Sequence, residues 1–322
     1  MFPPCRTPET YEMDQQIPTV ARSVTGSRPR RRRLSRKAIA GYAFVMPSLL
    51  FLLVFSLAPF IFTVWVSLHE WNMLTPVSEM PYRGLDNYRY LLTEDPIFLD
   101  TARNTIYFAV ANVAISVVLA LGIALILNGP IRFRAFWRAA FFIPYVTIPV
   151  AIAIVWSSML NARYGMINGL LDLVGLDPQP FLDSVDQALP TVIAVAVWQG
   201  IGYYMIIFLA GLQAIPEDLY DAGKLDGAGS WKLFWSITLP LLRPTMLFVV
   251  VVNTLNSLQI FDLPFILTQG GPVNSTNTLV LYMYDTAFMF LRMERATAMA
   301  VLLFLVIFVI TLIQLRLLRE RD

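Results

Sequence analysis

Residues 296–315 read ATAMAVLLFLVIFVITLIQL, a run of twenty residues that contains no charged side chain. A helix needs about 20 apolar residues to cross the hydrocarbon core of a bilayer, which is about 30 Å thick. Five further segments meet this test, and the predicted spans are residues 39–67, 105–127, 139–160, 189–213, 245–267 and 296–315. The sequence therefore predicts an all-α integral membrane protein with six transmembrane helices.

The composition of the whole chain agrees with this prediction. Of 322 residues, 57% are hydrophobic and only 14% are charged, and the mean hydropathy is +0.62. A soluble domain carries about 25% charged residues, so these values exclude an ordinary soluble enzyme. The single cysteine, Cys5, excludes an intramolecular disulfide, and the single histidine, His69, excludes a metal site built from several histidines.

The first predicted span is longer than one crossing requires. At about 1.5 Å per residue, a helix over residues 39–67 would extend well beyond the hydrocarbon core. Proline disrupts a helix at its own position, so we expect Pro47 or Pro59 to separate a short interfacial piece from the true span.

The basic residues predict the orientation of the spans. If six helices cross the membrane, 18 of the 24 Lys and Arg residues lie on the side that holds both termini. Cytoplasmic loops carry the excess of Lys and Arg, so both termini are expected in the cytoplasm. Nine of the 18 lie in residues 1–37, which we expect to be a disordered basic cytoplasmic tail that touches anionic lipid and not nucleic acid. The apolar stretch that follows is too long for a signal peptide.

The predicted spans contain almost no ionisable residue. Only Asp262 falls inside a crossing, whereas intramembrane catalysis and ion coupling usually require charged groups there. We therefore expect a non-catalytic chain that binds no metal and no cofactor. Any uphill transport would take its energy from another subunit, and an ion-coupled secondary carrier is the less favoured alternative.

Uncharged polar residues do occur in the fourth and fifth spans. The candidates for a solute path are Gln199, Tyr203, Asn253, Asn256, Gln259 and Asp262. Such residues can line a hydrated path, and they can equally hold helices together by hydrogen bonds. For Asp262 we favour a structural role, in which it holds the turn at Pro264 and Gly270–Gly271.

The segment Ile215–Pro244 reads IPEDLYDAGKLDGAGSWKLFWSITLPLLRP and connects the fourth and fifth predicted spans. Pro216 followed by two acids predicts a helix start. Asp226–Gly227 predicts a turn, and Ser230 predicts the cap of a second helix, which Leu239–Pro240 ends. The second helix carries Trp231, Phe234 and Trp235 in one stripe. Two short helices with aromatic anchors favour docking of a cytoplasmic partner, and an interfacial helix lying on lipid is the alternative.

The pattern DAGKLDGAGSWKLFWSITLP in this segment resembles the EAA loop of binding-protein-dependent ABC importer permeases. That loop has Glu-Ala-Ala, a glycine and then Ile-x-Leu-Pro, and this chain has Asp221-Ala222-Gly223, Gly227 and Ile237-Thr238-Leu239-Pro240 at the same spacing. Asp221 replaces the family's Glu, and Gly223 replaces the second Ala and should cost the helix about 1 kcal/mol. FVMPSLLFLLVFSLAPFIFTVWVSLHEWN, YRGLDNYRYLL and FDLPFILTQGGP resemble the carbohydrate-type members, which include permeases for maltose, other oligosaccharides and glycerol 3-phosphate.

The resemblance implies a type I importer permease over residues 38–322, located in the cell membrane, with a coupling loop at residues 215–244. The residues that it assigns to ATPase coupling are Asp221, Ala222, Gly223, Asp226, Gly227, Trp231, Ile237, Leu239 and Pro240. The implied partners are a second permease subunit that forms a heterodimer, two ABC ATPases that hold ATP and Mg²⁺, and an external solute-binding protein. Because no Lys or Arg lies within a predicted span, a neutral sugar is preferred over glycerol 3-phosphate.

Overall fold

The computed structural model describes residues 36–319, which form two units that divide between Phe55 and Ser56. Most of the predicted disordered tail, residues 1–35, therefore lies outside the described residues.

The N-terminal unit is helical. It contains α1 (Arg36–Leu52), and the following π-helical turn η1 (Leu53–Leu57) begins in it. Pro47 lies inside α1 without ending it, so the expected break is not at this residue. The hydrogen-bond pattern changes instead at η1, which ends two residues before Pro59. A proline ring collides with the carbonyl four residues earlier, and a π-helical turn relieves that collision by widening the helix.

The second unit, residues 56–319, is helical, and within it the only β-type pairing is an isolated bridge between His69 and Tyr82. Its longer helices are α2 (Ala58–Ser67), α3 (Asp86–Thr93), α4 (Phe98–Asn128), α5 (Arg134–Val146), α6 (Pro149–Met159), α7 (Met166–Leu173), α8 (Val185–Gln213), α9 (Glu217–Leu225), α12 (Arg243–Leu258) and α15 (Met293–Arg319). The shorter elements are η2 (Val77–Glu79), η3 (Phe181–Asp183), α10 (Ser230–Leu233), η4 (Phe234–Thr238), α11 (Leu239–Leu241), α13 (Asp262–Leu267), α14 (Leu279–Tyr284) and η5 (Asp285–Met289).

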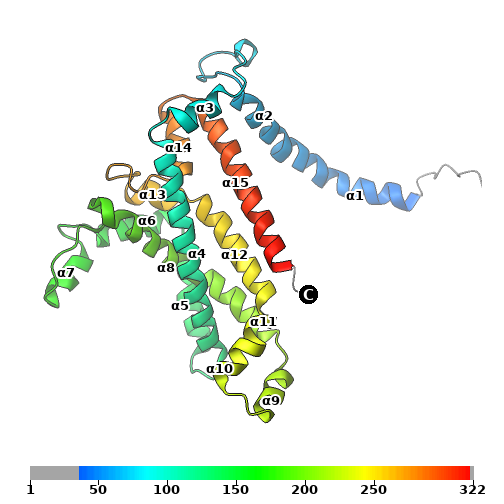
Figure 1. Cartoon of the computed structure of the whole chain (residues 1–322), viewed down its shortest axis with the longest axis vertical. Helices are drawn as coiled ribbons and strands as arrows, with labels where there is room; N and C mark the ends of the chain where they lie inside the picture. Colours follow the sequence, from blue (N-terminus) through cyan, green and yellow to red (C-terminus); the bar gives the residue numbers. More distant parts are fainter. Residues whose placement is uncertain (1–35, 320–322) are drawn as a thin grey trace, which may run out of the picture. The chain divides into compact units, whose positions relative to one another are not determined.

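Five helical segments are long and apolar enough to cross a membrane. They are Phe44–Ser67, Phe98–Asn128, Val185–Gln213, Arg243–Leu267 and Met293–Arg316. Figure 1 shows α4, α12 and α15 running in similar directions, with α3 near one end and α9 and α10 at the other. The prediction of a helical membrane protein is confirmed, and five of the six predicted spans have a counterpart in one helical segment.

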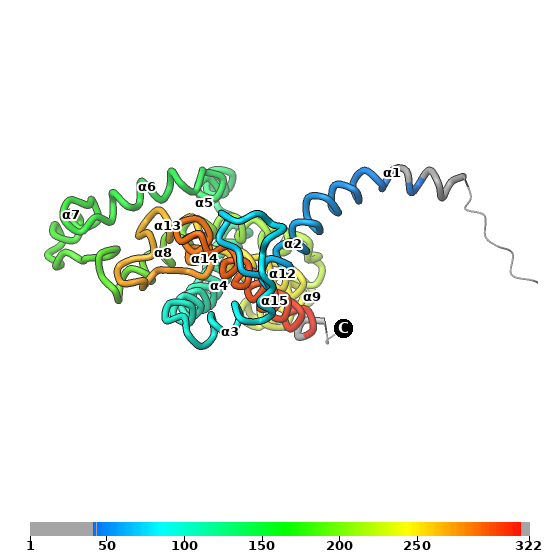
Figure 2. The backbone as a smooth tube through the Cα atoms, turned by 90° about the horizontal axis from the view of Figure 1, so that it is seen from above, coloured from blue at the N-terminus to red at the C-terminus, as the bar shows by residue number. Residues whose placement is uncertain are grey.

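The third predicted span, residues 139–160, is not one straight helix. It consists of α5 and α6, which meet at an angle of 96°. The break follows from Pro149, because the residue before a proline is driven out of the helical conformation, and Ile148 has an extended ψ of 123°. Figure 2 shows α6 and α7 reaching sideways beyond α5. The segment counts as a sixth span only if the bent pair is taken as one crossing.

The core of this unit is built on the contact between α4 and α8. Ala120 and Ala124 of α4 are fully buried against a cluster that includes Met205 and Phe208 of α8. Small side chains one helical turn apart allow two helices in a membrane to approach closely. The interhelical contact therefore depends on residue size as well as on apolar character.

The contact between α5 and α8 is closer still. At Gly202 of α8, an added Cβ atom would collide with the backbone carbonyl of Phe141 in α5. A glycine is therefore required at this position, and the half-length helix α5 lies directly on the backbone of α8.

Candidate functional site

The segment between α8 and α12 forms the two expected helices at one end of the unit (Figure 1). In α9, Pro216 is the N-cap residue and Glu217 and Asp218 occupy the first turn, where carboxylates interact favourably with the helix dipole. Gly227 then has a φ of +77°, a left-handed conformation that glycine adopts without steric cost.

The second helix differs from the prediction at both ends. Its N-cap residue is Gly229 and not Ser230, and no side chain caps it. It also does not end at Leu239–Pro240, because α10 continues through the π-helical turn η4 into α11. The π-helical turn directly before Leu239–Pro240 accommodates the proline ring within the helix, as η1 does before Pro59.

Gly223 marks the contact between the two loop helices. A Cβ atom at this position would lie 2.5 Å from Cδ2 of Leu233 and 3.2 Å from Cδ1 of Ile237. A hydrogen bond of 3.0 Å between the Tyr220 and Thr238 hydroxyl groups joins the same two segments. The glycine therefore has a packing role that its low helix propensity alone would not suggest: it lets α9 lie directly against the second helix.

The acidic residue of the loop is accessible. Asp221 accepts a hydrogen bond of 2.8 Å from Nζ of Lys224, and this bond raises the pKa of the lysine amine. Both side chains are about two-thirds exposed, so the pair itself contributes little to stability. The carboxylate remains open to a further cationic partner.

Large apolar side chains are exposed on both helices of the loop. Leu225 is 90% exposed, Trp231 is 75% exposed and Trp235 is 52% exposed, and the two indole rings lie 5.8 Å apart. We call these three residues the loop surface. Exposed aromatic groups of this size are typical anchors of a protein interface.

The predicted coupling residues thus fall into two groups. Five are exposed, namely Asp221, Ala222, Asp226, Gly227 and Trp231. Four are partly buried, namely Gly223, Ile237, Leu239 and Pro240. The exposed group can contact another protein, whereas the second group can hold the loop in shape.

A cavity of about 320 Å³ lies among α4, α5, α8 and α12, and its lining contains no charged residue. Its polar lining residues are Asn112, Tyr145, Gln199, Tyr204, Asn256 and Ser257. Nδ2 of Asn256 donates to the Tyr204 hydroxyl group at 3.4 Å. Aromatic rings beside amide groups suit a neutral ligand with hydroxyl groups.

Two interrupted helices border this cavity. The break between α5 and α6 lies at Tyr145 and Pro149, which both line it. The break between α12 and α13 lies between Ser257 and Leu263, which also line it. Helix ends leave backbone N–H and C=O groups without intrahelical partners, so interrupted helices supply polar backbone at membrane depth.

Of the predicted path residues, only Gln199 and Asn256 line the cavity. The ring of Tyr203 does not line it but stacks on the ring of Tyr145 at 4.5 Å. Asn253 is fully buried and accepts hydrogen bonds at Oδ1 from Asn112 and Ser257, at 3.1 and 3.2 Å. The structure therefore favours the alternative role for Asn253, in which it joins α12 to α4.

Gln259 and Asp262 are exposed at the break between α12 and α13. Asp262 makes no side-chain hydrogen bond with any described residue, and its expected role at the following turn has no support. Two threonines hold that turn instead, through a 2.6 Å bond between the hydroxyl groups of Thr268 and Thr276 and a 2.8 Å bond from Thr276 to the Gly271 carbonyl.

Four polar residues that line the cavity were not among the predicted path residues, namely Asn112, Tyr145, Tyr204 and Ser257. Tyr204 directly follows the predicted Tyr203 in the sequence. The sequence shows that both residues are aromatic, but it does not show which of the two faces the cavity. Asn112 is an isolated polar residue in an apolar span. No local sequence pattern indicates that it lies next to the fifth span.

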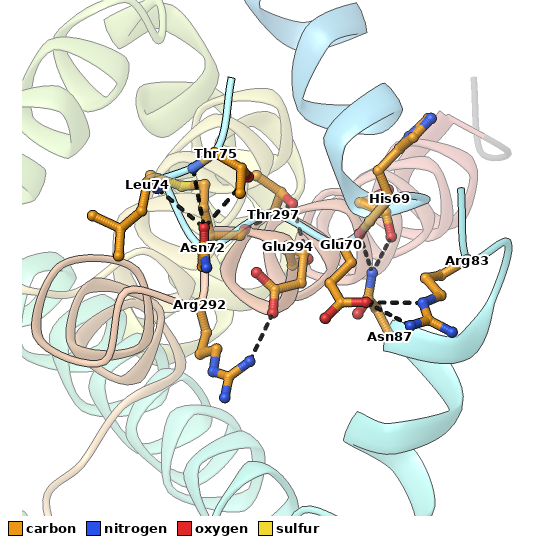
Figure 3. A network of polar contacts seen from close by, with 12 residues as sticks. His69, Glu70, Asn72, Leu74, Thr75, Arg83, Asn87, Arg292, Glu294 and Thr297 are labelled. Atoms are coloured by element: carbon orange, nitrogen blue, oxygen red, sulfur yellow. Dashed lines mark hydrogen bonds and ion pairs between the residues drawn. The ribbon is translucent and has the colours of Figure 1, made fainter. Parts of the chain in front are cut away.

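A second polar region lies at the end of the unit opposite the loop, where a hollow of about 450 Å³ is lined by residues of α3, the start of α15 and the loop after α2. Arg83 pairs with Glu70 at 2.8 Å, and Arg292 approaches the buried Glu294 at 3.9 Å (Figure 3). Arg295 lies 3.7 Å above the ring of Tyr90. Acidic and basic groups alternate here, and within the described residues no cluster of three or more His, Cys, Asp or Glu could hold a metal ion.

Comparison with known proteins connects these features to one family. Residues 113–321 match the model of the family described as "Binding-protein-dependent transport system inner membrane component". The trehalose/maltose transport system permease protein MalF of Thermococcus litoralis is 35% identical over 250 residues, which are 78% of this chain and 84% of that protein. The sn-glycerol-3-phosphate transport system permease protein UgpA of Agrobacterium fabrum is 34% identical over 239 residues, 74% and 81% of the two chains.

Among solved structures, the fold resembles a chain of a bacterial alginate ABC transporter that was crystallised in complex with a periplasmic protein bound to an alginate pentasaccharide. The TM-score is 0.77 at 22% sequence identity, and the match covers 88% of this chain and 95% of the other. At this identity the likeness concerns the fold alone.

Proposed function

The chain belongs to the family of binding-protein-dependent transport system inner membrane components, and we propose that it is a permease subunit of an ATP-driven importer for a neutral sugar. The observation that carries this proposal is the loop at residues 215–244. Its two helices, joined at Gly227, present the loop surface and the accessible carboxylate of Asp221 beyond the ends of α8 and α12.

The proposed orientation places this loop and both termini in the cytoplasm. The support is the distribution of basic residues, of which 18 of 24 lie on the loop side if the bent pair of α5 and α6 counts as one crossing. The polar hollow beside α3 then lies on the external side, where a solute-binding protein would dock.

The proposed partners are a second permease subunit, two ABC ATPases and an external solute-binding protein. The related alginate transporter was crystallised with its periplasmic protein, which supports the last of these. Closure of the ATPases would move the loop through the nine predicted coupling residues, and the movement would pass into α8 and α12. ATP and Mg²⁺ would be held by the ATPases, and this chain would catalyse no reaction.

A neutral sugar is the proposed solute because the cavity offers amide and hydroxyl groups but no charge. The relatives include a permease named for trehalose and maltose. A relative named for sn-glycerol-3-phosphate keeps that solute as the alternative. A phosphate group would favour a cationic partner, and no Lys or Arg lines the cavity.

Reconstitution of the complex tests the proposed function. In proteoliposomes that contain this chain with its second permease and ATPases, we expect sugar-loaded binding protein to stimulate ATP hydrolysis and sugar uptake together. Proteoliposomes with this chain alone should show no uptake. Uptake by the single chain would identify a secondary carrier, and a complex whose ATP hydrolysis never responds to the loaded binding protein would contradict the importer.

Two asparagines on α12 distinguish the solute path from helix packing. Asn256→Ala removes an exposed amide from the cavity, and we expect the KM of uptake to rise about fivefold, the equivalent of one hydrogen bond, with Tm unchanged. Asn253→Ala removes the acceptor of two buried hydrogen bonds, and we expect a lower Tm because leaving such groups unpaired costs about 1–3 kcal/mol.

Uptake kinetics and thermal unfolding of the purified complex measure the two effects separately. If Asn256→Ala lowers Tm as much as Asn253→Ala and leaves the KM unchanged, Asn256 belongs to the packing of the helices and the assigned path is wrong.

A further inference from the structure

An apolar groove of about 590 Å³ lies among α4, α5 and α8, and all of its lining residues are apolar. Ala194 and Ile201 of α8 line it together with Leu119 of α4 and Phe141 of α5. The cavity with polar lining uses different residues of α8, among them Gln199 and Tyr204. The groove is therefore separate from the proposed solute path.

The length and lining of the groove suit an acyl chain. Along α8 its lining runs from Pro190 to Ile201, a length of about 16 Å at 1.5 Å per residue. The lining residues are all apolar, which is the environment into which an acyl chain transfers favourably.

Three arginines lie near Trp137 in the sequence, at the start of α5, although none of them lines the groove. Trp137 lines one end of the groove. Helix α5 begins at Arg134, one turn before Trp137, and Arg132 lies two residues before Arg134. Arg138 follows Trp137 directly and lies one turn after Arg134. Between Asp100 and Asp172 the sequence contains no acidic residue. Within the described residues these three arginines form no salt bridge, and the buried Nε atom of Arg138 has no hydrogen-bond partner.

We propose that this groove binds an anionic phospholipid, with its acyl chain along α8 and its phosphate at Arg134 and Arg138. The positive end of the α5 dipole adds to the charge of the arginines, and both attract a phosphate. Trp137 lies between the basic and apolar parts, where an indole ring suits the boundary between headgroups and acyl chains. Basic pockets between membrane helices are suited to anionic headgroups.

The experiment uses the assembled complex in nanodiscs with lipids that carry a photoreactive group on the acyl chain. Phosphatidylglycerol, which is anionic, is compared with phosphatidylcholine, which is zwitterionic, and labelled peptides are identified by mass spectrometry. We expect phosphatidylglycerol to label residues 190–201 at least about fivefold more, since each basic residue near the surface strengthens the binding of anionic lipid.

The double variant Arg134→Gln/Arg138→Gln should reduce labelling by phosphatidylglycerol to the level of phosphatidylcholine. Its matched control is Arg243→Gln/Arg316→Gln, which removes two exposed basic residues on the same side of the protein and should leave the labelling unchanged. Ala194→Trp fills the groove and should abolish the labelling by either lipid, with Tm measured to show that the complex remains folded.

Three results would overturn the proposal. Equal labelling by the two lipids would contradict the proposed preference for anionic headgroups. Full labelling in the double variant would contradict the proposed role of the two arginines. No labelling by either lipid would show that protein, such as the second permease subunit, covers the groove. If the double variant does not assemble, labelling of the unchanged complex by the two lipids still tests the preference for anionic lipid. Labelling of Ala194→Trp then tests whether the lipid lies in the groove.

Discussion

Replacing Gly227 with proline is expected to reduce sugar uptake by the assembled complex at least about tenfold, the equivalent of about 1.4 kcal/mol. Proline holds φ near −65°, whereas Gly227 has a φ of +77° between α9 and α10. The turn cannot keep its shape, so Asp221 and Trp231 can no longer meet one rigid partner together. ATP hydrolysis should lose its response to the loaded binding protein, which is measured in the same proteoliposomes.

Gly229→Pro is the matched control for this change. Gly229 lies in the same turn, but its φ of −73° suits proline, and its amide takes no part in the backbone hydrogen bonds of the turn within the described residues. This variant should retain uptake. If Gly227→Pro transports as well as Gly229→Pro does, the shape of the loop does not carry the coupling.

Trp231→Ala is expected to weaken association with the ATPase subunits by about 30-fold or more. Loss of a central aromatic anchor costs about 2 kcal/mol or more at protein interfaces. Trp231 is 75% exposed within this chain and contacts Phe234 and Trp235 through ring edges and faces, so its removal leaves the chain's own core intact. The Kd for the purified ATPase, measured with the permease in nanodiscs, reports the effect.

Tyr164→Ala provides a control of similar exposure away from the loop. Tyr164 is 78% exposed in the segment between α6 and α7, which the proposed orientation places on the external side. Its removal should leave the ATPase Kd unchanged. An unchanged Kd in Trp231→Ala would assign this tryptophan to the lipid surface, the alternative that the sequence leaves open.

The membrane character of the fold could be predicted from the sequence because it depends on the length of apolar runs, which is a local property. The loop could be predicted for a similar reason, since Pro216, Gly227 and the tryptophans act within a few residues of their own positions. The bend at Ile148 was missed because hydropathy is the same in a straight helix and a bent one. Pro149 marks the bend, but the same span contains Pro144, which lies inside α5 without ending it.

The cavity could be predicted only in part, because its lining depends on the rotation of each helix against its neighbours. Asn253 and Asn256 lie three residues apart, yet one is fully buried and the other is exposed. The difference is set by Asn112 of α4, which bonds to Asn253 from 141 positions away in the sequence. No local pattern contains that information.

The π-helical turns η1 and η4 each end two residues before a proline, at Pro59 and Pro240. A π-helical turn contains one residue more than an α-helical turn. If η4 returned to α geometry, the ring of Pro240 would again collide with the carbonyl of Ser236, four residues earlier. Pro240 therefore keeps the wide turn in place, and the wide turn fixes the rotation of Trp231 about the helix axis relative to α12.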